Sequence, residues 1–351
     1  MSWENNVRRV IPYVAGEQPK NKNVIKLNTN ECPYPPAPGV EDKKRELDCG
    51  DLRLYPDTDA STLRSELARY YGVRDEQIFI GVGSDDVISM SFMTFFNGRA
   101  PILFPDVTYS FYDVWAKLYR IPYEQIPLKE DWHIDPSDYK KENGGIIFPN
   151  PNAPTGLLES LDTVESIIAA NKDVVVIVDE AYIDFCGKSA LPLIEKYDNL
   201  LVVQTFSKSR AMAGLRVGFA IGNEKLIKYL NDVKFSFNSY TMNRPAQVLG
   251  VEAVRDDAYF KDICGRIINT REWVKKELTR LNFSFPDSSA NFIFAMHKNK
   301  PAKEIFTALR EREIYVRYWN KPRIDNYLRI TIGTDDEMKA LINALEEISI
   351  S

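Results

Sequence analysis

The sequence predicts an α/β protein with a mostly parallel sheet between layers of helices. Short runs of branched apolar residues, such as residues 174–178, recur between residues 78 and 221. Segments of helix length, for example residues 161–171, separate several of these runs. Strands that are apolar on both faces and alternate with helices are typical of a parallel sheet buried on both sides.

The composition sets limits on the class of protein. The chain has 351 residues, of which 44% are hydrophobic, so it can bury a large core in two lobes. Its net charge is −5 and no basic run stands out, which argues against nucleic acid as a partner. The N-terminus lacks an apolar signal segment and no apolar run is long enough to span a bilayer. We therefore expect a cytoplasmic protein with no membrane partner.

The residues that usually bind metals or form disulfides are sparse. Four cysteines, Cys32, Cys49, Cys186 and Cys264, are widely spaced and form no Cys-x-x-Cys pair. The only two histidines do not lie near a serine or cysteine nucleophile motif. The sequence therefore predicts no metal site, no disulfide framework and no Ser-His-Asp hydrolase.

Changes in pattern divide the chain into three predicted parts. Residues 1–49 are irregular and proline-rich, and are expected to form an arm that packs near the small lobe. Residues 50–245 carry the alternating strands and helices of a large domain. Residues 246–351 have the mixed pattern of a small α+β domain.

The large domain is expected to begin with a helix that Ser61 caps and Gly72 ends. Its further helices include residues 111–118 and 161–171. Its predicted strands are residues 78–80, 102–104, 146–148, 174–178, 200–203 and 217–221.

The small domain is expected to begin with a long helix. Its last helix begins at Thr334, where Glu337 completes a capping box, and runs to about residue 348. The other predicted elements are helices at residues 259–281 and 302–312 and strands at residues 291–295, 314–317 and 327–332.

One loop, residues 205–218, suggests a specific chemistry. Lys208 follows a buried strand, and a poorly solvated amine is easily deprotonated and attacks carbonyls. Arg216 lies eight residues on and is suited to a two-pronged phosphate contact. An aldehyde and a phosphate together indicate pyridoxal phosphate. Taken alone, a surface lysine and an ordinary loop arginine fit the pattern as well.

The residues after the other predicted strands decide between a cofactor site and an ordinary surface loop. Ligands of open α/β sheets lie beyond the carboxyl ends of the strands. After residues 78–80, a glycine turn leads into a helix at Ser84 and Asp85, whose free N–H groups suit a phosphate. Tyr109 follows the next strand and is a candidate to stack on a planar ring. Asn152 lies in a rigid proline-rich loop that could direct its amide at a ring oxygen.

Asp179 follows the fully apolar run 174–178. A carboxylate there is costly unless a cation pairs with it, and a protonated pyridine nitrogen would serve. With that pairing the ring accepts electrons from a carbanion. Tyr182 is within reach of the same ring's hydroxyl oxygen, whereas an ordinary helix-capping aspartate is the alternative. Together the strand ends, the lysine and the arginine predict a pyridoxal-phosphate enzyme.

These motifs resemble those of the fold-type I aminotransferases, and more narrowly the histidinol-phosphate aminotransferase family. The resemblance extends from about residue 10 to residue 333. It implies a seven-stranded, mostly parallel sheet, pyridoxal phosphate as cofactor, and a homodimer with shared active sites. The motifs that carry it are Asn-Pro-Asn-x-Pro-Thr-Gly from Asn150, Asp-Glu-Ala-Tyr from Asp179, Ser207-Lys208, and Ala-Gly-Leu-Arg-x-Gly from Ala213.

The resemblance also implies roles for single residues. Lys208 would bind the cofactor covalently and transfer the proton at the substrate's Cα. Asp179 would bind the ring nitrogen, Tyr182 and Asn152 the ring hydroxyl, and Tyr109 the ring face. The residues implied to hold the cofactor phosphate are Ser84, Asp85, Ser207, Arg216 and, from the partner subunit, Tyr55. Those implied to bind the substrate's anion are Tyr13, Arg317 and Arg329.

Strand alternation agrees with the role of Arg329. In residues 327–332, Leu328, Ile330 and Ile332 lie on one face and Arg329 on the other. A solvated surface arginine is the alternative.

Several positions depart from the family's pattern. Ala153 stands where many relatives have the asparagine that contacts the ring, which leaves Asn152 as the candidate. The other departures are Cys32, Pro35, Leu54, Val82, Arg210 and Met212.

The expected reaction is transamination of L-histidinol phosphate with 2-oxoglutarate in histidine synthesis. The alternatives are an aromatic amino acid aminotransferase, a lyase resembling the threonine-phosphate decarboxylase of cobalamin synthesis, and a non-catalytic cofactor-binding paralogue.

Overall fold

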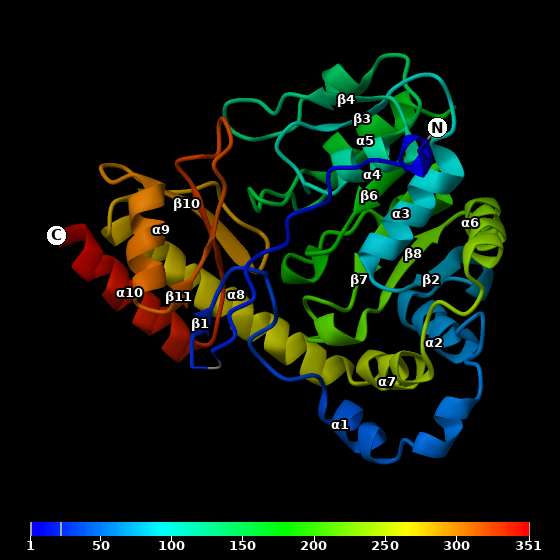
Figure 1. Cartoon of the computed structure of the whole chain (residues 1–351), viewed down its shortest axis with the longest axis horizontal. Coiled ribbons are helices and arrows are strands. Elements are labelled where there is room, and N and C mark those ends of the chain that lie inside the picture. Colours follow the sequence, from blue (N-terminus) through cyan, green and yellow to red (C-terminus); the bar gives the residue numbers. More distant parts are fainter. Residues whose placement is uncertain (1, 22, 351) are drawn as a thin grey trace.

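The computed structural model describes residues 2–21 and 23–350, without the side chain of residue 350. Its two sheets lie in separate lobes, and the long helix α8 (Asp257–Arg280) runs from beside α7 (Arg244–Arg255) in the larger lobe into the smaller one (Figure 1). The predicted helix at residues 259–281 is therefore present. The proposed domain boundaries near residues 49 and 245 remain predictions.

The sheet of the large lobe has seven strands in the order β2-β8-β7-β6-β5-β3-β4. Only β8 runs against the others, because it pairs antiparallel with both β2 and β7. The predicted mostly parallel α/β sheet is confirmed. The strands are β2 (Ile78–Gly81), β3 (Ile102–Pro105), β4 (Tyr123–Ile126), β5 (Ile146–Pro149), β6 (Val176–Asp179), β7 (Leu200–Thr205) and β8 (Gly218–Gly222).

Successive side chains of each strand enter different cores. On β6, Val176 and Val178 pack with the helices of one face, while Ile177 packs with those of the other. This two-sided burial explains the continuous apolar runs. The first face is covered by α2 (Ser61–Tyr71), α5 (Leu161–Ala170) and α7, and the second by α3 (Ser84–Phe95), α4 (Tyr112–Tyr119) and α6 (Glu224–Phe237).

Three local predictions were wrong. The edge strand β4 was not foreseen, because only Ile126 of its four residues is buried. Strand β6 begins at Val176 rather than residue 174. Ser61 does not cap α2: Ala60 occupies that position, and Asp57 Oδ2 accepts the Ser61 N–H at 2.7 Å. Gly72, with φ of 69°, ends the helix as predicted.

The small lobe is α+β, as predicted. Its antiparallel sheet has the order β12-β13-β10-β9. The predicted strand at residues 314–317 is divided between β11 and β12, which lie in different sheets. The elements are β9 (Phe283–Ser284), β10 (Phe292–His297), β11 (Ile314–Tyr315), β12 (Arg317–Tyr318), β13 (Leu328–Thr331), α9 (Ala302–Glu311) and α10 (Asp335–Ile350).

The N-terminal arm packs on the small lobe, because β1 (Ile25–Lys26) pairs in parallel with β11. The arm also contains an unpredicted helix, α1 (Pro38–Arg45), which packs against α7. The capping box of α10 is confirmed by bonds between Thr334 N and Glu337 Oε2 (2.7 Å) and between Glu337 N and Thr334 Oγ1 (3.3 Å).

Short 3₁₀ segments connect these elements. They are Trp3–Asn6, Cys49–Arg53, Asp75–Gln77, Pro136–Tyr139, Ile183–Phe185, Leu191–Glu195 and Ala213–Leu215. Within residues 2–21 and 23–350, no helix is both long and apolar enough to cross a membrane. The same residues contain no cluster of His, Cys, Asp and Glu side chains that could hold a metal ion.

Candidate active site

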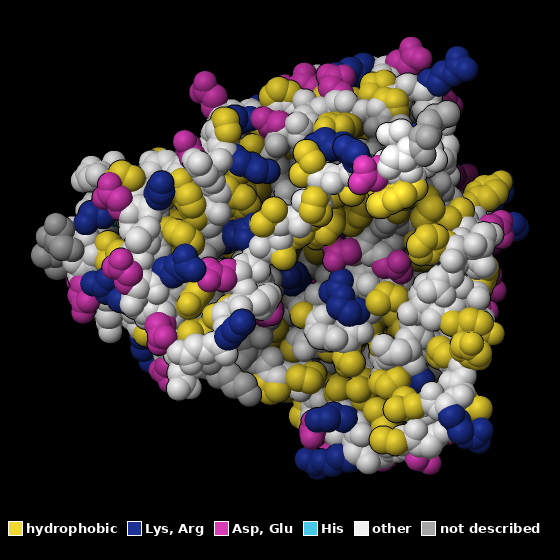
Figure 2. All heavy atoms as spheres, viewed as in Figure 1, with side chains coloured by type: hydrophobic (Ala, Val, Ile, Leu, Met, Phe, Trp, Pro, Cys, Tyr) yellow, Lys and Arg dark blue, Asp and Glu magenta, His cyan; other side chains and the backbone are white. Residues whose placement is uncertain are grey.

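A pocket of about 500 Å³ opens between the lobes, where Figure 2 shows a hollow with acidic and basic side chains. Its wall combines the ends of the large sheet's strands, the arm and the small lobe. The predicted site residues that line it are Tyr13, Asp85, Tyr109, Tyr182, Lys208, Arg216, Arg317 and Arg329. Five others lie outside the lining that the described residues form: Tyr55, Ser84, Asn152, Asp179 and Ser207.

Lys208 follows the buried strand β7 and lines the pocket. Its Nζ donates to the carbonyl oxygen of Thr29 in the arm at 3.1 Å. Burial, followed by the positive charge of Arg329, lowers the pKa of Lys208 from 10.5 to about 8. A larger fraction of this amine is therefore neutral near neutral pH, which is the form that attacks carbonyls.

The start of α3 and the Arg216 side chain form an anion site. The first N–H groups of a helix have no acceptor within it and favour negative charge. Arg216 Nη2 lies 2.9 Å from Asp85 Oδ2 beside this helix start. A Cβ on Gly83 would lie 2.6 Å from Arg216 Nη2, and one on Gly218 would lie 2.4 Å from Ser84 N. The two glycines thus make room for the arginine and the helix to meet, and the arrangement fits a phosphate.

Ser207 directly precedes Lys208 in the chain and does not line the pocket. It is buried, and its Oγ is 2.9 Å from Thr205 Oγ1. Its hydroxyl therefore has a partner within the protein, and its predicted contact with the cofactor phosphate stays a prediction.

Asp179 ends β6 and is 4% exposed. Tyr112 Oη donates to its Oδ2 at 2.8 Å, and the Ala181 N–H donates to its Oδ1 at 3.2 Å. Burial raises the pKa of Asp179 to about 6. It forms no ion pair with a residue that the structure describes. A buried carboxyl group of this kind fits a cationic ring nitrogen, which would favour its charged form.

Tyr112 was not predicted to take part in the site. It lies in the predicted helix at residues 111–118 and is fully buried against the Trp115 and Phe104 rings. Its hydroxyl nevertheless orients Asp179. No pattern in the sequence relates residues 112 and 179, because the contact depends on how α4 packs over β6.

Tyr182 lies in the wall of the pocket, with its ring centroid 5.9 Å from Lys208 Nζ. Its Oη accepts a hydrogen bond from Asn30 Nδ2 at 2.9 Å. Since Asn30 occupies an acceptor position of the phenol, the hydroxyl proton remains available to an acceptor in the pocket. Asn30 is a second site residue that the sequence analysis missed.

Asn152 uses its amide N–H groups for bonds within the protein. Its Nδ2 donates to the Val107 carbonyl and to Thr155 Oγ1, both at 3.0 Å. The adjacent Ala153 and Pro154 line the pocket in its place. The predicted contact of Asn152 with the cofactor ring stays a prediction, and these bonds argue against it.

Tyr109 lines the pocket and donates from Oη to Asp85 Oδ1 at 2.7 Å. Its ring packs nearly perpendicular to Tyr112, with centroids 5.7 Å apart. The ring is thus held between the phosphate end and the Asp179 end of the site. Its predicted stacking on the cofactor remains a prediction.

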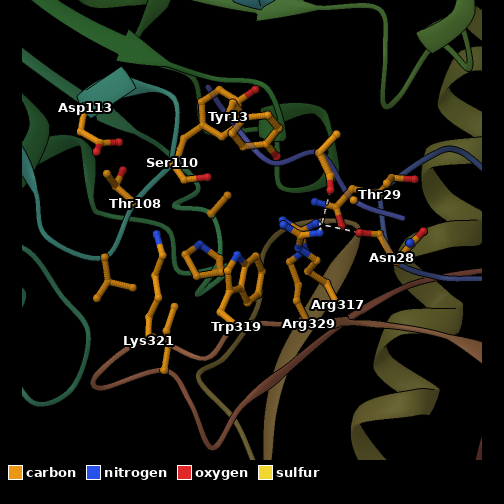
Figure 3. A pocket seen from close by; sticks show the side chains of 18 of the residues that line it. Tyr13, Asn28, Thr29, Thr108, Ser110, Asp113, Arg317, Trp319, Lys321 and Arg329 are labelled. Atoms are coloured by element: carbon orange, nitrogen blue, oxygen red, sulfur yellow. Dashed lines mark hydrogen bonds between the residues drawn. The ribbon is translucent and has the colours of Figure 1, made fainter. Parts of the chain in front are cut away.

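The other end of the pocket is cationic (Figure 3). Arg329 Nη2 donates to the Asn28 carbonyl at 3.0 Å, and Arg317 makes longer bonds to the Val14 and Ala15 carbonyls. Neither guanidinium group forms an ion pair with a residue that the structure describes. Tyr13 lies at the same end, with its ring stacked 4.0 Å from that of Phe111. This end fits an anionic group of a substrate.

Tyr55 does not reach the pocket of its own chain. It is 77% exposed, and its ring lies 4.4 Å from that of Tyr240. Its predicted contact with the cofactor phosphate of a partner subunit stays a prediction.

The model of the family "Aminotransferase class I and II" matches residues 22–345. Histidinol-phosphate aminotransferases from Lactococcus lactis subsp. cremoris (strain MG1363) and Clostridium botulinum (strain Langeland / NCTC 10281 / Type F) are 51% and 50% identical to the chain. Each alignment covers 99% of this chain and 98% of the relative.

Solved structures of lower identity share the fold. The histidinol-phosphate aminotransferase from Sinorhizobium meliloti, in complex with pyridoxal-5'-phosphate, has a TM-score of 0.85 at 23% identity and covers 93% of this chain and 91% of its own. The L-threonine-O-3-phosphate decarboxylase from Porphyromonas gingivalis has a TM-score of 0.79 at 22% identity and covers 93% of this chain and all of its own. The predicted fold type is therefore confirmed. Pyridoxal phosphate as the cofactor is confirmed by the family match rather than by these structures. The chain belongs to the class I and II aminotransferases, within the group of histidinol-phosphate aminotransferases.

Proposed function

We propose that the protein transfers the amino group of L-histidinol phosphate to 2-oxoglutarate, yielding imidazole-acetol phosphate and glutamate in histidine synthesis. The observation that carries this proposal is that the pocket holds Lys208 together with Arg317 and Arg329, whose guanidinium groups form no ion pair with any described residue. An amino donor with an anionic end matches both. The names and full-length coverage of the relatives agree with this choice.

The site residues fit pyridoxal phosphate. Arg216 and the start of α3 would hold its phosphate, Asp179 its ring nitrogen, and Tyr182 its hydroxyl oxygen. When bound, pyridoxal phosphate supplies an aldehyde that accepts amines and a ring that accepts electron density from the donor's Cα.

Lys208 is the proposed acid and base of the reaction. Its lowered pKa of about 8 leaves Nζ able to take a proton from the substrate's Cα and to give it up again. After burial, the positive charge of Arg329 is the next largest cause of this lowered pKa. In this proposal Arg329 also binds the substrate anion. Binding the donor at the arginines fixes the distance between its Cα and the lysine, which lowers the entropic cost of the transfer.

We also infer that two copies of the chain form a homodimer that shares its active sites. Large apolar side chains are exposed around Tyr55, and solvent exposure of such a group marks an interaction surface. They are Leu52, Leu54, Tyr55, Phe237 and Tyr240. Mixing an inactive Lys208→Ala protein with a Tyr55→Ala protein tests this inference. Recovered activity in the mixture is expected if Tyr55 acts across the interface, and no recovery would contradict it.

We further propose a cytoplasmic location. All four cysteines are free, including the exposed Cys49, which suits a reducing compartment. Cell fractionation with an antibody against the chain tests this, and recovery in a secreted fraction would contradict it.

A substrate panel distinguishes the proposed reaction from its alternatives. The loaded enzyme would be mixed separately with histidinol phosphate, phenylalanine and threonine phosphate, and the amine form of the cofactor followed by absorbance. Conversion with histidinol phosphate is expected. Conversion with phenylalanine alone would indicate an aromatic aminotransferase, and release of carbon dioxide from threonine phosphate would indicate a lyase.

A further inference from the structure

Two positive side chains face each other in the small lobe. Strands β12 and β13 pair antiparallel, and Arg317 is the direct partner of Arg329 in that register. Like charges at directly opposed positions of a sheet destabilise it. Neither guanidinium group forms an ion pair within the described part of the chain. Another contact must therefore offset their repulsion when no substrate is bound.

The indole ring of Trp319 makes contact with both guanidinium groups. The Cζ atoms of Arg317 and Arg329 lie 5.4 and 5.2 Å from its ring centroid. Figure 3 shows Trp319 beside both arginines in the pocket wall. The face of an indole ring carries partial negative charge and attracts cations within about 6 Å. Trp319 is thus an aromatic partner that the two arginines share.

The two arginines depend on this ring to different degrees. Arg329 has a further bond to the Asn28 carbonyl at 3.0 Å and a second aromatic partner, Phe292, at 5.3 Å. Besides Trp319, the partners of Arg317 among the described residues are carbonyl oxygens of the arm, at the longer distances of 3.3 and 3.4 Å. Removing the indole ring should therefore release Arg317 more than Arg329.

We propose that Trp319 is a positioning residue of the substrate-anion site: its ring holds Arg317 and Arg329 side by side, so that a phosphate meets two guanidinium groups already in place. Preplaced groups bind more tightly because less side-chain freedom is lost on binding. A cation–π contact in a partly desolvated site corresponds to about a three- to thirty-fold change in affinity. This inference rests on the proposed use of these arginines for a phosphate-bearing donor.

Binding of inorganic phosphate to the loaded enzyme tests the inference, because the cofactor then occupies its own phosphate site. Calorimetry would give Kd for the wild type and for Trp319→Leu, Trp319→Phe and Trp132→Leu. Trp132 is the matched control: it is also half-buried and lies 5.0 Å from an arginine, Arg323, outside the pocket lining. Trp319→Leu should raise Kd for phosphate about ten-fold, whereas Trp319→Phe should retain most of the affinity. Trp132→Leu should leave Kd for phosphate nearly unchanged.

Kinetics provide a second readout. Trp319→Leu should raise KM for histidinol phosphate by a similar factor and leave kcat within about three-fold, because the ring acts through the anion-binding Arg317 and Arg329. Equal losses of phosphate affinity in the Trp319→Leu and Trp319→Phe variants, or no loss of affinity in either, would overturn the proposal. If Trp319→Leu does not fold, Trp319→Met replaces it. Failure of the wild type to convert histidinol phosphate would count against the proposed function, whereas phosphate affinity would still test Trp319.

Discussion

Asn30 Nδ2 donates a hydrogen bond to the hydroxyl of Tyr182 at 2.9 Å, which connects the arm to the wall of the cofactor site. Asn30 is fixed by further bonds to the small lobe, where its N–H donates to Thr331 Oγ1 at 3.0 Å and its carbonyl accepts from Asn291 at 3.1 Å. Its backbone lies in the left-handed region, with φ of 55°. The neighbouring carbonyl of Thr29 accepts from Lys208. One turn of the arm thus orients two residues of the site.

The first prediction concerns Asn30→Ala. The change removes the donor to Tyr182 and frees the phenol to rotate, so its proton is no longer directed into the pocket. Loss of such a bond is worth about 0.5–1.5 kcal/mol, and we expect kcat/KM to fall about three- to ten-fold. The pH at which the visible absorption of the loaded enzyme changes should shift as well. Asn299→Ala, in an exposed turn, is the control, and equal behaviour of the two variants would argue against this role.

The second prediction is that Lys208 lowers the stability of the apoprotein. A lysine with a folded pKa of about 8 and an ordinary value of 10.5 is disfavoured in its charged form by folding. The cost is fully present below pH 8 and disappears as pH rises past 10.5. Lys208→Met should therefore stabilise the apoprotein at pH 7, by up to about 3 kcal/mol, while abolishing activity.

Urea denaturation of the apoprotein at several pH values measures this effect. The advantage of Lys208→Met over the wild type should shrink between pH 8 and 10.5. Lys172→Met, on the surface, should show no such gain. A Lys208→Met protein that is less stable at pH 7 would show that the lysine's packing outweighs its desolvation.

The third prediction concerns Asp179→Asn, which keeps the shape of the side chain but removes its charge. The bond from Tyr112 Oη can persist, since an amide oxygen also accepts. Without the carboxylate the ring nitrogen loses its counter-charge, so kcat should fall by at least about a hundred-fold. Circular dichroism and cofactor content should remain close to those of the wild type. Retention of most activity would mean that Asp179 does not face the ring nitrogen.

The fourth prediction concerns Asn152. Because its amide bonds Val107 and Thr155, Asn152→Ala should loosen the loop and lower thermal stability rather than change the cofactor's spectrum. Ala153→Asn places an amide at the neighbouring position, which lines the pocket, and should shift the spectrum instead. A spectral shift in Asn152→Ala at unchanged thermal stability would instead support the predicted direct contact of Asn152 with the cofactor ring.

The sequence predicted the sheet and the chemistry of its strand ends well, because both depend on local signals. The apolar residues Val176 to Val178 predict a strand buried on two faces. Burying the carboxylate of Asp179 at its end is costly without a partner, which indicates a ligand. The edge strand β4 was not predicted, because the exposed Glu124 and Gln125 interrupt the apolar pattern.

Contacts between distant segments could not be predicted. Tyr112 with Asp179, and Asn30 with Tyr182, are 67 and 152 residues apart in the chain. Trp319 lies two residues from Arg317, but its contact with Arg329 depends on the register of β12 and β13. Such pairs follow from packing, which no local pattern encodes.

The central claim is that Lys208 and the Arg317–Arg329 pair act on one donor that carries both an amine and a phosphate. The most direct measurement is a single-turnover comparison of histidinol phosphate with histidinol, its analogue without the phosphate, followed by absorbance of the cofactor. We predict rapid conversion with histidinol phosphate and an apparent Kd for histidinol weaker by about a hundred-fold or more, because two charge-assisted contacts are lost. In Arg329→Ala, the difference in apparent Kd between histidinol phosphate and histidinol should become smaller. Equal conversion of both donors by the wild type, or no conversion of histidinol phosphate, would contradict the claim.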